Sequence, residues 1–177
     1  MNDFTPNSRI EQYFAGLAEN TFLTELGVVD PPMVDYITDL LVRFVRNDVV
    51  HRVRGITGRP VTTVTEMIAE ATNRLGDAKR EVYRHIGDFT LFWAGVYPEA
   101  LRQEEHAHDH GQFEAFCTHG KRSYHLAATI ETDKETPKPD VLLRLSDRFD
   151  LCTYGLREIR RQWESNDGNG SGIVLFN

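Results

Sequence analysis

The sequence has few of the features that mark secreted, membrane and nucleic-acid-binding proteins. It contains only two cysteines, Cys117 and Cys152, too few for a disulfide-stabilised scaffold. No apolar run approaches the roughly 18 residues of a membrane helix. The first residues, MNDFTPNSRIEQ, lack the basic start and apolar centre of a signal peptide. We therefore expect a cytoplasmic protein with reduced thiols and no membrane partner.

Basic residues are outnumbered as well. The chain has 20 Lys and Arg against 27 Asp and Glu, a formal net charge of −7. Because nucleic-acid binders usually carry a basic excess, we expect no nucleic acid among the partners. The 27% of charged and 40% of hydrophobic residues are ordinary for a globular protein, and a length of 177 residues fits a single domain.

Helix signals recur along the chain, whereas no long alternating Val/Ile-rich segment predicts a strand. Ser8 with Glu11, and Thr63 with Glu66, form capping-box patterns, and Asp30 precedes a proline as an N-cap does. The first predicted helix starts near Ser8, and Phe22, Leu23 and Leu26 either continue it or form a short second helix that ends near Gly27. Four further helices are predicted: from Asp30 to about Arg54, from Thr63 to Tyr97, from about Phe113 to Thr132, and from about Pro137 to near Glu164. The fold class is therefore an all-α bundle of five or six helices.

The longest predicted helix covers residues 63–97 and carries an apolar residue at every third or fourth position. The stripe consists of Val64, Ile68, Ala71, Leu75, Ala78, Val82, His85, Phe89 and Phe92. Pro98 should end this helix, and Gly87 and Gly95 should allow a neighbouring helix to approach closely. Its aromatic residues either belong to the core or line a pocket for a flat ligand; core packing is the commoner role.

Two short segments resemble each other, with Cys117 three residues before Gly120 and Cys152 three residues before Gly155. Small residues on one helical face favour close helix packing. The alternative is a pair of redox-active thiols, which would need a basic or exposed setting. The sequence favours packing.

The domain boundary is placed at residue 164. Residues 1–164 are expected to form the bundle, and residues 165–177 a Gly-rich linker followed by an apolar tail, Ile173–Phe176. Apolar residues at a terminus are costly to leave in water. We expect the tail to dock either on its own bundle or on a second copy of the chain. Docking on a second copy would make the protein a homo-oligomer.

His85 lies four residues after Glu81 and three before Asp88, so both carboxylates are within its reach on a helix. The three residues are catalytic candidates, because such a group can bind a divalent metal or activate a general base. His51 or Tyr124 would assist the reaction, and His51 and His85 are the candidate metal ligands. The alternative is a buried core histidine beside a solvated carboxylate face. It is favoured, since the Glu-x-x-His pairs of bundle metal sites are missing.

The only basic cluster of the sequence coincides with the expected end of the second helix and the Gly-containing loop after it. It contains five arginines: Arg43, Arg46, Arg52, Arg54 and Arg59. Arginine clusters bind phosphates, nucleotides and acidic partners. They also complement the helix C-terminal dipole and form pairs such as Asp39–Arg43, and this simpler role is favoured.

Three segments, YITDLLVRFVRND (36–48), RHIGDFTLFWAGVYPEAL (84–101) and GKRSY (120–124), resemble an uncharacterised family of bacterial all-helical proteins. The resemblance extends from about Asn20 to Glu164. It implies a bacterial cytoplasmic helical protein and supplies no activity, cofactor or catalytic residue.

These observations favour a module that binds a protein or a small ligand, rather than an enzyme, with no cofactor required by the sequence. The alternative hypothesis is a metal-dependent helical-bundle enzyme centred on Glu81, His85 and Asp88.

Overall fold

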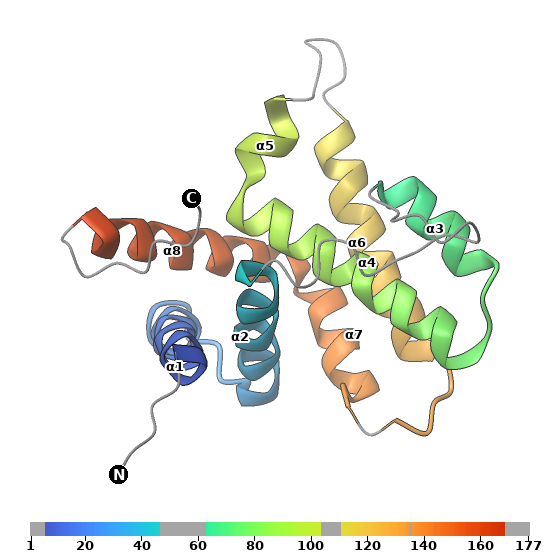
Figure 1. Ribbon diagram of the computed structural model, residues 1–177, viewed down its shortest axis with the longest axis horizontal. Coiled ribbons are helices and arrows are strands. Elements are labelled where there is room, and N and C mark those ends of the chain that lie inside the picture. Colours follow the sequence, from blue (N-terminus) through green and yellow to red (C-terminus); the bar gives the residue numbers. More distant parts are fainter. Residues whose placement is uncertain (1–5, 47–62, 104–110, 135, 169–177) are drawn as a thin grey trace.

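The computed structural model describes residues 6–46, 63–103, 111–134 and 136–168, and the regular structure of these residues is entirely helical (Figure 1). The elements are α1 (Pro6–Glu19), the π-helix η1 (Asn20–Glu25), α2 (Pro31–Val45), α3 (Val64–Thr72), α4 (Gly76–Val96), α5 (Pro98–Gln103), α6 (Gln112–Thr129), α7 (Pro139–Asp147) and α8 (Phe149–Gly168). The predicted all-α class is confirmed. The predicted number of helices is wrong, because the described residues contain eight α-helices. None of these helices combines the length and the apolar character needed to cross a membrane.

The predicted single helix over 63–97 is two helices. Asn73 caps the end of α3, and Gly76 begins α4 with a φ of +53°, a conformation that glycine adopts without a steric penalty. Leu75, assigned to the buried stripe by its spacing, is 84% exposed at this break.

The predicted last helix is also divided. Arg148, with φ −107° and ψ 24°, ends α7, and α8 then leaves in a different direction (Figure 1). Helix α8 continues to Gly168, past the expected domain boundary at residue 164, so the start of the predicted linker is helical. The apolar tail lies outside the described residues, as does the expected end of α2 near Arg54.

Local signals placed several helix ends correctly. The Asp30 carboxylate accepts a 3.2 Å hydrogen bond from the amide of Met33 at the start of α2. Thr63 caps α3 and donates its hydroxyl to Glu66 at 2.9 Å. Pro98 follows the end of α4, as expected. The capping box at Ser8 is wrong, because α1 begins at Pro6.

Helix α4 lies at the centre of the molecule and packs against α2, α3, α6 and α8 (Figure 1). Its glycines Gly87 and Gly95 admit side chains from neighbouring helices, as predicted. A Cβ atom at Gly87 would lie 2.6 Å from the ring of Tyr124 on α6, and one at Gly95 would lie 2.6 Å from Leu156 on α8.

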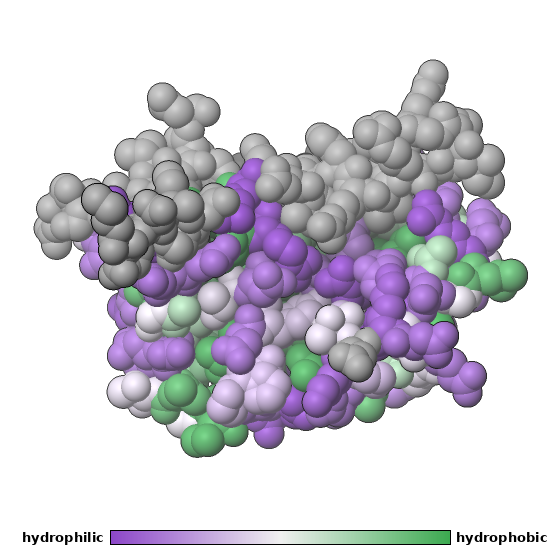
Figure 2. Space-filling model, turned by 60° about the horizontal axis from the view of Figure 1, so that its bottom comes forward, coloured by the Kyte–Doolittle hydropathy of each residue, from purple (hydrophilic) through white to green (hydrophobic). Residues whose placement is uncertain are grey.

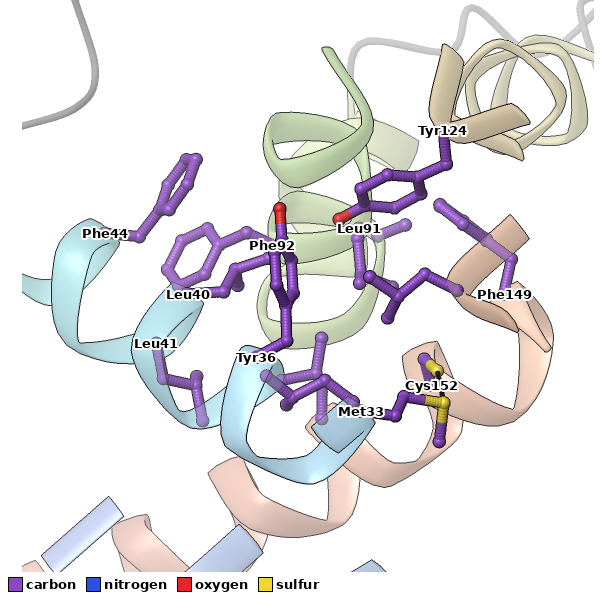
Figure 3. Packing of buried hydrophobic residues seen from close by; sticks show 14 of the residues in the cluster. Met33, Tyr36, Leu40, Leu41, Phe44, Leu91, Phe92, Tyr124, Phe149 and Cys152 are labelled. Carbon is purple, nitrogen blue, oxygen red and sulfur yellow. Dashed lines mark hydrogen bonds between the residues drawn. The ribbon is translucent and has the colours of Figure 1, made fainter. Parts of the chain in front are cut away.

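The interior is built where α2, α4, α6 and α8 meet (Figure 3). Cys152 is fully buried, with its sulfur 4.0 Å from that of Met33. Burial raises the pKa of the Cys152 thiol to about 12. Gly155 approaches Phe22 and Gly120 approaches Phe149, so the Cys–Gly segments serve helix packing, as the sequence favours.

The described part of the face shown in Figure 2 is mainly hydrophilic, with its hydrophobic residues in separate small patches. Such a surface is usual for a chain with 27% charged residues.

Candidate binding cleft around Asp88

Asp88 on α4 joins three helices through one buried carboxylate. Its Oδ1 atom accepts hydrogen bonds from the Tyr36 hydroxyl on α2, at 2.6 Å, and from the Tyr124 hydroxyl on α6, at 2.9 Å. Figure 3 shows the two hydroxyl groups converging from opposite sides of the core. Burial, followed by the negative charge of Asp88, raises the pKa of both tyrosines, so they remain protonated donors.

The second carboxylate oxygen of Asp88 faces two arginines. Nη1 of Arg43 donates to Oδ2 at 3.0 Å, and Nη1 of Arg84 lies 3.6 Å from the same atom. Burial alone would raise the pKa of the Asp88 carboxyl, but these positive charges and the hydrogen bonds from Tyr36 and Arg43 outweigh it and lower the pKa. Asp88 is therefore ionised, and its charge is neutralised by its neighbours.

The carboxylates predicted to flank His85 are directed toward arginines. Glu81 accepts hydrogen bonds from Arg84 at 2.8 and 3.3 Å, while Asp88 binds the tyrosines and arginines described above. The His85 ring stacks on Phe44, with centroids 6.4 Å apart and planes inclined by 14°, and is 5% exposed. His85 is thus a buried core histidine, the role that the sequence favours.

No group of three or more His, Cys, Asp and Glu side chains is placed to hold a metal ion within the described segments. Glu81, His85 and Asp88 therefore do not assemble the metal site of the alternative hypothesis. His51, the other metal candidate, lies outside the described residues.

A cleft of about 640 Å³ opens beside this network, between α2, the first half of α4, the connection after α6 and the start of α7. Seven of its lining side chains are charged: Asp39, Arg43, Glu81, Arg84, Lys134, Lys138 and Asp140. The apolar part of its wall consists of Pro32, Tyr36, Pro137 and Val141. The cleft therefore combines a charged region over Arg43 and Arg84 with an apolar wall.

Two arginines have buried hydrogen-bond donors without an acceptor among the described residues: Arg43, which lines the cleft, and Arg80, which lies behind it. Arg80 is fully buried, and its Nη2 atom donates to the carbonyl of Pro137 at 2.6 Å. Nη1 of Arg80 lies 3.7 Å from Glu81, beyond hydrogen-bond distance, and neither Nη1 nor Nε donates to an acceptor among the described residues. Nη2 of Arg43 is likewise buried and unsatisfied. Buried donors normally have partners, so these atoms indicate a missing acceptor.

The predicted arginine cluster is brought to the cleft only in part. Arg43 lines it, whereas Arg46 at the end of α2 lies 3.6 Å from Glu11 of α1. The other three members, Arg52, Arg54 and Arg59, fall outside the described residues.

The sequence interpretation missed Tyr36, Arg80, Arg84, Lys134 and Lys138. The only local signal was the four-residue spacing of Arg80, Arg84 and Asp88 on one side of a helix. The approach of α2 to this side of α4 has no signature in the sequence.

Comparison of the chain with protein-family models, with curated proteins and with solved structures finds no match. The resemblance to a bacterial helical family is therefore not supported by a relative, and no activity can be transferred to this cleft.

Proposed function

We propose that this protein is a binding module for a small acidic molecule, held in the cleft between α2, α4 and α7. The proposal depends on one observation above all: Arg43, which lines the cleft, has a buried Nη2 donor without an acceptor. Arg80, which lies behind the lining residue Pro137, has two more such donors. A carboxylate or phosphate group of a ligand would supply the acceptors that these donors lack.

The charges around the cleft support an anionic ligand. The chain as a whole has a net charge of −7, yet four of the seven charged lining residues are basic. All three acidic ones are already paired, because Asp39 binds Arg43, Glu81 binds Arg84 and Asp140 binds Arg144. Lys134 and Lys138 stand at the rim, where they would attract an anion from solution.

The network around Asp88 holds the arginines in place before any ligand arrives. Arg43 is fixed by Asp39 and Asp88, and Arg84 by Glu81 and Asp88. A guanidinium held in this way loses less side-chain entropy on binding than a free one. The apolar wall formed by Pro32, Tyr36, Pro137 and Val141 favours a ligand that has an apolar body as well as an acidic group.

Titration calorimetry with phenyl phosphate and benzoate tests the proposal, with benzamide as a neutral compound of similar shape. We expect one anion per chain to bind, with an affinity that falls as salt is added, and we expect no binding of benzamide to this cleft. Comparing the affinities of phenyl phosphate and benzoate shows whether the cleft prefers a phosphate or a carboxylate group. Lack of binding by both would refute the proposal.

Three lysine variants locate the binding site. Lys134→Ala or Lys138→Ala should each weaken binding by about twofold to fivefold, the effect of removing one exposed charge. Lys121→Ala is the control for Lys134→Ala, because both lysines are about half-exposed and each pairs with one carboxylate, Lys134 with Glu81 and Lys121 with Asp150. Lys121 lies outside the cleft. Equal effects of all three substitutions would mean that binding occurs elsewhere.

A further inference from the structure

A second cleft, of about 590 Å³, lies along the C-terminal half of α4, where α3, α5 and α6 begin or end beside it. It shares no lining residue with the cleft around Asp88. Four aromatic side chains line it, namely Phe89, Trp93, Phe113 and Phe116, and none of its described lining residues is charged.

The aromatic rings of this cleft form a continuous wall across two helices. Phe89 contacts Trp93 along α4 and Phe116 on α6, with ring centroids 6.2 Å apart in each case. Leu101 of α5 adds an aliphatic surface. A volume of about 590 Å³ is within the usual range for small-molecule pockets, which are mostly apolar with a few polar groups.

One lining residue of this mainly apolar cleft has a buried donor without an acceptor. Nε1 of Trp93 is buried and has no hydrogen-bond partner among the described residues. A buried indole N–H normally donates to an acceptor, so its surroundings lack one. Thr63 and Gln112 are the polar lining residues, and the Thr63 hydroxyl already donates to Glu66. The uncharged, mainly aromatic lining and the Trp93 donor together define the shape and chemistry of a complementary molecule.

We propose that this cleft binds a neutral, planar, mainly apolar small molecule whose one hydrogen-bond acceptor pairs with Nε1 of Trp93. The flat body stacks among Phe89, Phe113 and Phe116, and the acceptor, a carbonyl oxygen for example, satisfies the indole N–H. This site is independent of the acidic-ligand cleft, and either can exist without the other.

A matched pair of probes tests the site. 9-Fluorenone is planar and has one carbonyl acceptor, whereas fluorene has the same ring skeleton without it. Equilibrium dialysis of the full chain measures the affinity of each. We expect fluorenone to bind at one site per chain. Absence of fluorenone binding up to its solubility limit would overturn the proposal.

Three variants locate the binding. Trp93→Phe keeps an aromatic ring but removes the N–H, so the ratio of fluorenone to fluorene affinity should fall by about twofold to tenfold, the effect of one neutral hydrogen bond. Trp163→Phe is the control, since Trp163 packs on Phe14, away from this cleft, and should leave the ratio unchanged. Ala100→Trp fills the cleft from its exposed rim and should abolish binding. A ratio unchanged in Trp93→Phe, or fluorenone binding retained in Ala100→Trp, would overturn the proposal.

Discussion

The Tyr36 hydroxyl on α2 donates a 2.6 Å hydrogen bond to the buried carboxylate of Asp88 on α4, across a separation of 52 residues in the sequence. This bond places a charged group of the central helix within the core, where only a specific set of donors can stabilise it. Tyr124 and the two arginines complete that set. Stability and the shape of the adjacent cleft therefore depend on the same residues.

Replacing Asp88 by Asn should destabilise the fold by about 3–5 kcal/mol, because Arg43 and Arg84 would remain partly buried without their shared counter-charge. Urea denaturation measures this. Asp150→Asn is the control, since Asp150 is 80% exposed and pairs only with Lys121 at the surface, so its loss should cost about 1 kcal/mol or less. Similar losses in the two variants would show that Asp88 does not bind its neighbours as described.

The stabilisation from Asp88 should depend on pH in a defined direction. Its pKa is lower in the folded state than the ordinary value of 3.8, so the folded state favours the ionised form. This contribution is fully present above the ordinary value and is lost as the pH falls through the folded-state pKa. The difference in unfolding free energy between the wild type and Asp88→Asn should thus be constant from pH 7 to pH 5 and shrink below pH 4. A difference that grows on acidification would contradict the lowered pKa.

Gly87→Ala should destabilise the protein by about 1–3 kcal/mol, although alanine favours helix formation, because the new methyl group would overlap the Tyr124 ring. That ring cannot move away freely, as its hydroxyl is bound to Asp88. The matched control is Gly16→Ala on α1, where nothing lies within 4 Å of the added carbon; it should stabilise by about 0.5–1 kcal/mol. Thermal unfolding measures the stability of both variants. Stabilisation by both substitutions would show that α4 and α6 are not in close contact.

Cys152 should not react with a thiol reagent while the protein is folded, because its side chain is inaccessible and its pKa is raised to about 12 by burial. The variant Cys117→Ser leaves Cys152 as the only thiol. We expect almost no reaction with Ellman's reagent at pH 8 within the time that fully labels the urea-unfolded chain. Rapid labelling of the folded variant would revive the redox interpretation of the two cysteines.

Local sequence signals were sufficient where a helix end depends on residues within one turn. Asp30 and Thr63 cap their helices, and Pro98 follows the end of α4, because each acts on backbone groups two or three positions away. The break before Gly76 was missed for the opposite reason. The apolar spacing continues through Leu75, which is exposed in the structure, while Gly76 adopts a positive φ and α3 folds back to pack on α4.

The candidate site residues also differ in how far the local sequence predicted their role. His85 was recognised as a helical stripe residue, and its burial beside Phe44 agrees with that spacing. Asp88 was grouped with His85 and Glu81 because all three are near neighbours on one helix. Its actual partners, Tyr36, Arg43 and Tyr124, come from two other helices, and no spacing within α4 indicates which helices those are.

By itself, the sequence determined the all-helical class, the acidic balance and several helix ends, since these follow from composition and from contacts within a turn. The tertiary structure alone decided where α4 is divided from α3, which charges are buried together and where the two clefts lie. The physical reason is that the hydrogen-bond partners of a buried carboxylate or guanidinium come from residues that are distant in the chain. Only the packing of helices brings those groups within hydrogen-bond distance.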